Sequence, residues 1–385
     1  MFKNVKSKYI LELIFENIQN KKKWNIIKHN KKILEKLEIT KEDFQVYDFL
    51  LVFNDKYYLN INDVDIRKLN IIDKVGLIDL CKIHFKYLKE LNLNNNNLSD
   101  ITPLGNAKFE NLEILLLNSN QISDIGVLSK VNFKKLKELY LGGNQISDID
   151  ILKKARFINL EILDFGTSFF SNNKISDISV FEKVNFKKLK KLYLSFNEIA
   201  DISVLKNVDF KELKELFLAH NKIEDISVFN AVNFPQLEVL NLNENKISDI
   251  NVLRYANLKN LNTLNLDENK ISDISVFEKV NFKELKALYL DYNLISDVNV
   301  IYKAKFQKLE KLYLRENKID ESIRAELIKL LSNKINDFEI WINNKEKFKK
   351  EIKSKLQLFP KWLFFKRNWI IDINFLKVTF KIQYN

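Results

Sequence analysis

The chain has little of the chemistry from which catalytic and metal sites are built. Its 385 residues include one cysteine, six glycines, three prolines and three histidines, the last at positions 29, 84 and 220. A single thiol excludes a disulfide framework and a cysteine-based zinc site. Six glycines leave no phosphate-binding loop or dinucleotide-binding turn. We therefore expect no enzyme, no metal and no cofactor, and we expect Cys81, which lies among Leu77, Leu80 and Ile83, to be a buried structural residue.

Long apolar runs are missing as well. No stretch of 18 uncharged apolar residues exists, so no transmembrane helix is predicted. The most apolar N-terminal run, Tyr9–Phe15, is interrupted by Glu12 and is not followed by a small-residue cleavage site. Proteins with almost no cysteine fit a reducing compartment. These features predict a cytoplasmic protein.

The net charge of +12 belongs to the two ends of the chain. Residues 1–84 carry 16 basic and 12 acidic residues, residues 322–385 carry 14 and 6, and the segment between them carries 33 of each. Only six of the basic residues are arginines, whereas nucleic-acid sites use arginine forks as well as lysines. The scarcity of arginine argues against a nucleic-acid site, and binding of nucleic acid or of a membrane through the basic ends is kept as an alternative hypothesis.

What the chain does have is a repeat. The pattern L-x-x-L-x-L-x-x-N-x-I occurs ten times at intervals of 24 residues, with one interval of 29. Its first leucine, position 1 of each repeat, is Leu88, Leu112, Leu136, Leu160, Leu189, Leu213, Leu237, Leu261, Leu285 or Leu309. Self-similarity at this period predicts an array in which each unit stacks on its neighbours.

Each position in the repeat has a predicted role. Leucines at positions 1, 4 and 6 point inward, and positions 3, 5, 7 and 8 point outward along a short strand. The asparagine at position 9 can satisfy buried backbone groups of a tight turn. The aspartate at position 13 (Asp100 is the first, Glu321 stands there in the last repeat) can cap a short helical turn. Phenylalanine at position 22 predicts a stacked spine through the back of the core.

The words NQISDI (144–149), NKISDI (173–178 and 245–250) and NKISDISVF (269–277) resemble the leucine-rich repeats of the SDS22-like class, which internalins share. The resemblance covers about residues 72–321. It implies an α/β fold: a curved right-handed solenoid with a parallel concave sheet inside and short helices outside. It also implies binding of another protein on the concave face, and SDS22-like proteins regulate a protein phosphatase. The repeats here have 24 residues instead of the usual 22. No segment of this sequence resembles the internalin secretion signal or cell-wall anchor, so we expect an intracellular member of the class.

The segments beside the array divide the chain into three parts. Residues 1–70 are predicted to be a helical N-terminal region. Residues 71–321 form the array, and its first part, residues 71–84, resembles a truncated half-repeat that seals the N-terminal end. Residues 322–385 are predicted to be a C-terminal cap or a small basic α+β domain, in which residues 358–369 are both aromatic and basic.

The outward positions of the strands form the candidate site. Aromatic side chains on a rigid sheet are typical anchors of protein interfaces, and the C-terminal half of the face is acidic, which predicts a partner with a basic surface patch. The predicted partner-binding residues are Tyr140, Phe169, Phe170, Tyr193, Phe196, Phe217, His220, Glu244, Asp267, Glu268, Tyr289, Asp291, Tyr292 and Tyr313.

Phe169 and Phe170 belong to an insertion of five residues in the fourth repeat, and we predict that this insertion forms a loop beside the face. The leading hypothesis for function is a non-catalytic interaction scaffold, with phosphatase regulation as one version of it. A second hypothesis is a ubiquitin-ligase substrate adaptor, because residues 10–18 faintly resemble the start of an F-box. Its opening Leu-Pro and closing Cys/Trp are missing.

Overall fold

The computed structural model describes residues 68–70, 77–82, 84–85, 88–166, 172–304, 306–320, 322–323 and 339–341. All of them belong to one compact unit, Met1–Trp341, while the second unit spans Ile342–Asn385. The predicted N-terminal helices before residue 68, the F-box-like segment and the basic segment 358–369 lie outside the described residues.

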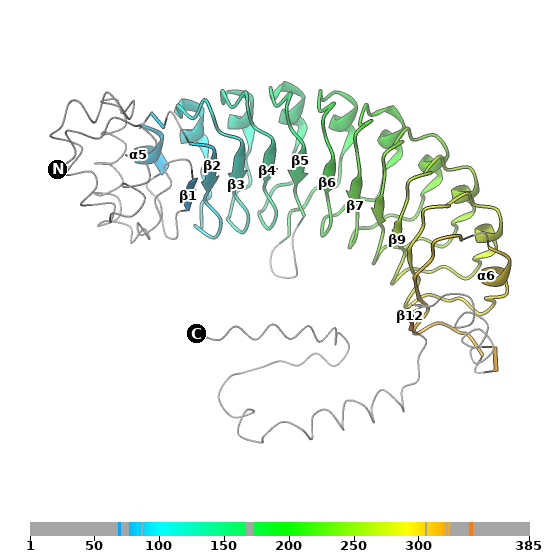
Figure 1. Ribbon diagram of the computed structural model, residues 1–385. Helices are drawn as coiled ribbons and strands as arrows, with labels where there is room; N and C mark the ends of the chain where they lie inside the picture. The colour runs from blue at the N-terminus through cyan, green and yellow to red at the C-terminus, as the bar shows by residue number, and fades with distance from the viewer. Residues whose placement is uncertain are drawn as a thin grey trace, which may run out of the picture. The chain divides into compact units, whose positions relative to one another are not determined.

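The described strands form one parallel sheet in strict chain order from β1 to β12, and they line the inner side of an arc of coils (Figure 1). The ten strands of the repeats are β2 (Glu90–Asn92), β3 (Ile114–Leu116), β4 (Glu138–Tyr140), β5 (Ile162–Asp164), β6 (Lys191–Tyr193), β7 (Glu215–Phe217), β8 (Val239–Asn241), β9 (Thr263–Asn265), β10 (Ala287–Tyr289) and β11 (Lys311–Tyr313). Equivalent repeat positions pair with one another, for example Leu192 with Leu216. The predicted parallel sheet is confirmed.

The strands alternate between core and solvent because side chains on a strand point to opposite faces. In β6 the central Leu192 is fully buried, and Lys191 and Tyr193 on either side are half-buried. The leucines at positions 1 and 6 are buried in the same way, as Leu189 and Leu194 show. The predicted inward and outward roles of the repeat positions are therefore confirmed.

The outer wall consists of short turns. They are 3-10 turns of four or five residues: η3 (Thr102–Asn106), η4 (Gly126–Ser129), η5 (Asp150–Lys154), η6 (Ser179–Glu182), η7 (Ser203–Asn207), η8 (Ser227–Asn230), η9 (Asn251–Arg254) and η10 (Ser275–Glu278). Two described α-helices accompany them, α5 (Leu77–Cys81) and α6 (Val300–Lys303). The predicted short helices are thus mostly single 3-10 turns, a geometry that suits pieces of this length.

The aspartate at position 13 precedes each 3-10 turn and binds its backbone. Asp201 Oδ1 accepts a hydrogen bond from the Ser203 amide at 2.7 Å, and Asp177 does the same for Ser179. This is an Asx turn, which satisfies an amide that the short turn leaves unpaired. In the last repeat Asp320, at position 12, accepts from the Ser322 amide at 2.9 Å. Glu321, predicted to cap this turn, lies outside the described residues.

The asparagine at position 9 joins consecutive coils. Asn245 Nδ2 donates to the carbonyl of Leu242 in its own repeat and to that of Leu218 in the repeat before, at 3.1 and 2.9 Å. Its Oδ1 accepts from the Ile223 amide at 3.0 Å. The pattern recurs from Asn120 to Asn317. The predicted structural role of this ladder is confirmed, and each rung is shared by two coils.

Phenylalanines fill the back of the core. Phe109 and Phe133 stack with their ring centroids 6.1 Å apart, and Phe85 meets Phe109 edge to face at 5.6 Å. Farther along, Phe210 packs edge to face against Phe181 of η6, in the preceding repeat, with the ring centroids 6.0 Å apart. The position-22 rings are therefore core residues, as predicted, although some of their ring contacts are to position 17.

The sheet extends by one strand beyond the predicted repeats on either side. β1 (Lys68–Asn70) pairs in register with β2, and β12 (Glu339–Trp341) pairs with β11. Ile340, which alternates with Phe338 and Ile342 in the sequence as apolar residues of a strand do, aligns with Leu312. The first strand lies at the end of residues 1–70, which were predicted to be helical, so the prediction is wrong for Lys68–Asn70. It contains Leu69 with Ile66 three residues earlier and Ile71 two residues later, an isoleucine version of the repeat.

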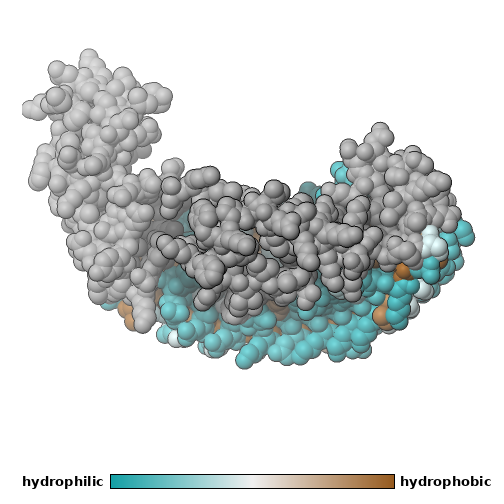
Figure 2. All heavy atoms as spheres, turned by 90° about the horizontal axis from the view of Figure 1, so that it is seen from below, coloured by the Kyte–Doolittle hydropathy of each residue, from teal (hydrophilic) through white to brown (hydrophobic). Residues whose placement is uncertain are grey.

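Ion pairs connect the exposed edges of neighbouring coils. Glu113 lies between Lys89 and Lys137, at 3.3 and 2.7 Å, and Lys214 pairs with Glu238 at 2.8 Å. These charges lie one residue before the strands of adjacent coils, where opposite signs favour this register over a slipped one. Figure 2 shows that the described surface visible in that view is largely hydrophilic, with small hydrophobic spots.

Candidate functional site

A row of large side chains crosses the centre of the concave face at position 5. Strand register places Tyr140, Asp164, Tyr193 and Phe217 next to one another on β4 to β7. The Tyr193 and Phe217 rings lie 5.0 Å apart at an angle of 58°. Both are half-buried and face away from the core. We call these four residues the central row.

The tyrosines of the central row are held by acceptors. Tyr140 Oη donates to Glu138 at 2.9 Å, and Tyr193 Oη donates to Glu215 at 2.8 Å. Burial, followed by these carboxylates, raises the pKa of both phenols well above its ordinary value. The two hydroxyls therefore stay protonated and their rings stay oriented.

A second row follows at position 8, where the backbone is left-handed. Phe196, His220 and Tyr292 have φ values of 59°, 50° and 54°. Left-handed backbone is unusual for such bulky residues and costs about 1 kcal/mol each, and Gly143 in the third repeat shows that glycine can occupy the position. Strained positions that carry large side chains instead are often functional.

Aromatic contact and a hydrogen bond link the members of this second row. The Phe196 and His220 rings stack with centroids 3.8 Å apart, and His220 Nδ1 lies 2.6 Å from Glu244 Oε2. Burial lowers the pKa of His220, with Glu268 opposing. A neutral imidazole at pH 7 donates its Nδ1 proton to the Glu244 carboxylate. Burial raises the pKa of Glu244 and, with repulsion from Glu244, that of Glu268.

The C-terminal end of the face is tied together by carboxylates at position 7. Asp267 Oδ1 accepts from the Asp291 amide at 2.6 Å, and Asp291 Oδ1 accepts from the Arg315 amide at 2.7 Å. Asp291 is only 2% exposed, and its other oxygen binds the Arg315 guanidinium at 2.5 Å and 2.6 Å. Burial and repulsion from Asp291 raise the pKa of Asp267 to about 8. This end therefore carries less exposed negative charge than the sequence alone suggests.

The predicted site residues fall into groups. Tyr140, Tyr193 and Phe217 meet in the central row, and Phe196, His220, Glu244 and Glu268 meet at position 8. Tyr289 and Tyr313 stack with their ring centroids 4.6 Å apart, and Tyr292 is exposed. Asp291 and Tyr313 are buried within the array. Phe169 and Phe170 lie outside the described residues. The chain resumes its pattern after the insertion, because Asn173 binds the Leu141 and Phe165 carbonyls.

Two residues of this face were not predicted. Asp164 belongs to the central row, and Arg315 neutralises Asp291. Both could have been found from the repeat numbering. Asp164 is the acidic residue at position 5 between two tyrosines, and Arg315 is the basic residue at position 7 one repeat after Asp291.

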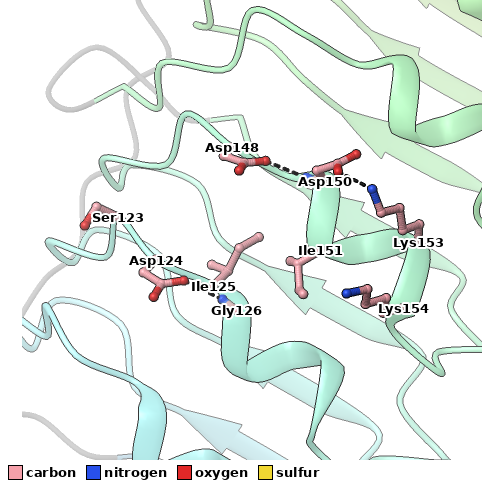
Figure 3. Close-up of a pocket in the computed structure, with 9 residues that line it drawn as sticks. All are labelled: Ser123, Asp124, Ile125, Gly126, Asp148, Asp150, Ile151, Lys153 and Lys154. Carbon is pink, nitrogen blue, oxygen red and sulfur yellow. Dashed lines mark hydrogen bonds and ion pairs between the residues drawn. The ribbon is translucent and has the colours of Figure 1, made fainter.

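The outer wall holds an open pocket of a different kind. It lies between the turns η4 and η5 and has a volume of about 440 Å³. Figure 3 shows that the Asp148 carboxylate bonds to the backbone of Asp150, and the Asp150 side chain pairs with Lys153. Asp124 likewise accepts from the Gly126 amide. These carboxylates cap turns, and they do not converge on a common point.

The described residues were also searched for a reactive thiol, a metal site and a membrane-spanning helix. Cys81 is buried, as expected, and burial raises the pKa of its thiol to about 12. No cluster of three potential metal ligands occurs among the described residues. In the same part of the chain, no helix is long and apolar enough to cross a bilayer.

Comparisons with known proteins agree with this geometry. The family model described as "Leucine Rich repeats (2 copies)" matches residues 110–154, 158–207, 211–255 and 235–279, and the model "Leucine Rich Repeat" matches residues 87–108. The chain is a leucine-rich repeat protein. Both matching models describe the repeat itself. A search of the curated proteins finds no significant match.

Solved structures similar to this leucine-rich repeat protein include two bacterial internalins and a chain from a complex of several proteins. An internalin, InlF, from Listeria monocytogenes is 26% identical, with 78% of this chain and 94% of that one covered and a TM-score of 0.47. Internalin C2 from the same species is 23% identical over 70% and 84%, with a TM-score of 0.37. A chain from the octameric complex of Latrophilin 3, Unc5D and FLRT2 (LRR) is 20% identical over 72% and 85%, with a TM-score of 0.53, and shares the fold.

Proposed function

We propose that this leucine-rich repeat protein is a non-catalytic scaffold that binds another protein on the concave face of its array, in the cytoplasm. The observation that carries the proposal is the pair of aromatic contacts on adjacent strands, Tyr193 with Phe217 and Phe196 with His220. Interface anchors are typically rigid aromatic side chains clustered near the centre of a contact surface. Here the rings already contact one another in the protein without a partner.

The strained backbone at position 8 supports this choice of surface. A left-handed residue is easiest to build as glycine or asparagine, and the first and third repeats have Asn95 and Gly143 there. Phe196, His220 and Tyr292 instead place large rings at the same point, against the local backbone preference. Packing of the core does not require these rings, because all three lie outside it.

The charge of the face indicates the chemistry of the partner. Asp164, Glu138, Glu244 and Glu268 lie on or beside the central strands. A basic patch on the partner is complementary to them, and such complementarity speeds association and fixes orientation. The solved complex of Latrophilin 3, Unc5D and FLRT2 is an assembly of several proteins that includes a chain of this fold. Among specific partners, a serine/threonine phosphatase is the one that the SDS22-like repeat words favour, and direct titration with its catalytic subunit tests that version. The insertion with Phe169 and Phe170 follows β5 in sequence, and we include it in the proposed binding surface.

The test compares the full-length protein with two variants. Tyr193→Ala/Phe217→Ala removes the aromatic anchors. Tyr255→Ala removes a 62% exposed aromatic residue that follows the outer turn η9 and stacks with Arg254. Proteins retained by the wild type are identified, purified and titrated against all three by calorimetry. We expect the double variant to bind at least tenfold more weakly and Tyr255→Ala to bind like the wild type.

The double variant must also unfold at a denaturant concentration close to that of the wild type, so that lost binding is not lost folding. Equal affinity of the double variant and the wild type for every purified partner would place the binding surface elsewhere and overturn the proposal.

A further inference from the structure

Asp164 occupies an unusual place in the central row. It stands at position 5 of β5, paired in register with Tyr140 on β4 and with Tyr193 on β6. Adjacent strands lie about 4.8 Å apart, so a carboxylate here has one tyrosine on each side. Burial leads the rise in the pKa of both phenols, and the charge of the neighbouring Asp164 adds to it.

The Asp164 carboxylate has few partners of its own. Its Oδ1 accepts from the Gly166 amide at 2.7 Å. No ion pair joins it to a lysine or arginine in the part of the chain that the structure describes. Burial raises its pKa to about 7, with only the Gly166 amide opposing. A desolvated carboxylate with no cation is costly, and a partner that brings a positive charge recovers that cost.

The tyrosines beside Asp164 do not neutralise it. Their hydroxyls donate to Glu138 and Glu215 instead, so their protons point away from Asp164. Of these two carboxylates, Glu215 forms an ion pair with Lys191, whose Nζ lies 2.9 Å from Glu215 Oε1. The neighbourhood therefore stays negative, and it presents aromatic rings on either side of the carboxylate.

We propose that Asp164, flanked by Tyr140 and Tyr193, is the subsite that receives a lysine or arginine side chain of the partner protein. The inference rests on the proposed function of the concave face and assigns one contact within it. A cation between the two rings donates a charge-assisted hydrogen bond to the carboxylate and is attracted by the ring faces. The same two rings cover the aliphatic stem of the incoming side chain.

The experiment uses full-length protein labelled with carbon-13 in its tyrosine rings, with the Tyr140 and Tyr193 signals assigned from Tyr140→Phe and Tyr193→Phe. Three pentapeptides with blocked ends are compared. Each has glycine at its four outer positions, and the central residue is arginine, lysine or citrulline. Citrulline has nearly the shape of arginine and no charge. We expect saturable shifts of both tyrosine signals with the arginine or lysine peptide, and at least tenfold weaker binding of the citrulline peptide.

Two variants locate the effect. Asp164→Asn keeps an acceptor for the Gly166 amide and removes the charge, and it should abolish the preference for arginine and lysine over citrulline. Asp209→Asn, which alters an exposed aspartate paired with Lys211 outside the central row, should respond like the wild type. A wild-type response from Asp164→Asn, equal binding of arginine and citrulline, or no tyrosine response to either cationic peptide would overturn the inference.

The same variants separate this inference from the proposed function. If Asp164→Asn binds the purified partner with wild-type affinity while Tyr193→Ala/Phe217→Ala does not, the subsite is wrong and the scaffold proposal stands. If the arginine peptide binds at Asp164 but the double variant keeps the partner, the scaffold surface is wrong, and the role of Asp164 in receiving the partner is overturned with it.

Discussion

Replacement of Asn245 by alanine tests the asparagine ladder most directly. The side chain is 8% exposed and makes hydrogen bonds to Leu218, Leu242, Asn243 and Ile223. The two leucine carbonyls each keep a second donor after the change, because Asn221 also donates to Leu218 and Asn269 to Leu242. The Ile223 amide, on a fully buried residue, is the group left without its partner.

The size of the effect follows from that count. One orphaned buried amide costs about 1–3 kcal/mol, and each of the bonds lost without an orphan contributes about 0.5–1.5 kcal/mol. With one orphaned amide and three further bonds lost, we expect Asn245→Ala to lower the free energy of unfolding by about 2.5–7.5 kcal/mol. Asn245→Asp keeps the acceptor for Ile223 but turns a carboxylate oxygen toward two carbonyls, so at pH 7 it should be at least as destabilising.

The assay is urea unfolding followed by circular dichroism, with the slope m compared between variants because arrays can lose cooperativity. The control is Asn243→Ala, two residues away on the same turn, since the Asn243 side-chain oxygen has no hydrogen-bond partner in the part of the chain that the structure describes. It should change stability by less than about 1 kcal/mol. A cost below about 1 kcal/mol for Asn245→Ala, or equal costs for the two alanine variants, would refute the reasoning.

Three further predictions concern packing and pH. Leu194→Ala or Phe210→Ala should each cost about 2–5 kcal/mol through the cavity formed, while Lys187→Ala, at an exposed site, should cost little; equal melting temperatures for all three would contradict the core assignment. A Cβ on Gly142 would lie 1.7 Å from the Gly166 carbonyl oxygen, so Gly142→Ala should cost about 3 kcal/mol or more by urea unfolding, whereas Gly105→Ala, 3.1 Å from a Val127 methyl group, should be much milder. Because the pKa of Asp267 is raised to about 8 in the folded state and is about 3.9 when unfolded, its stabilising contribution is full below pH 4 and is lost as pH rises through 8. Asp267→Asn should therefore gain stability relative to the wild type between pH 5 and pH 9 in thermal melts, and a constant difference would exclude the titration.

The repeat made most of the fold predictable because each position has one physical task. Leu192 must be inside, Asn197 must bind backbone and Asp201 must start a turn in every copy, so ten copies confirm one another. The strand β1 was missed because its leucines are replaced by isoleucine around Leu69 and its spacing to β2 is 22 residues. The order of the outward positions was readable too, which placed Tyr193 beside Phe217.

Hydrogen-bond direction and burial on the concave face could not be read in the same way. Tyr140 and Tyr193 donate to glutamates at position 3, once on the same strand and once on the next, and only geometry decides which. Asp291 has the same outward position as Ser195, yet Arg315 covers it. Such differences depend on pairs of long side chains whose rotamers the repeat pattern does not fix.

Because the asparagines join each coil to the next in the same way, the asparagine ladder also fixes the spacing of contact points along the array. Each asparagine bonds only within its own coil and to the coil before it, so a whole coil could be added or removed with every type of bond preserved. Even with the extra residues before it, Asn173 makes these hydrogen bonds. One coil changes the span between the central row and the Asp267–Arg315 end by about 4.8 Å, the spacing of neighbouring strands. The distance between two contact points on a partner would then be set in steps of one coil.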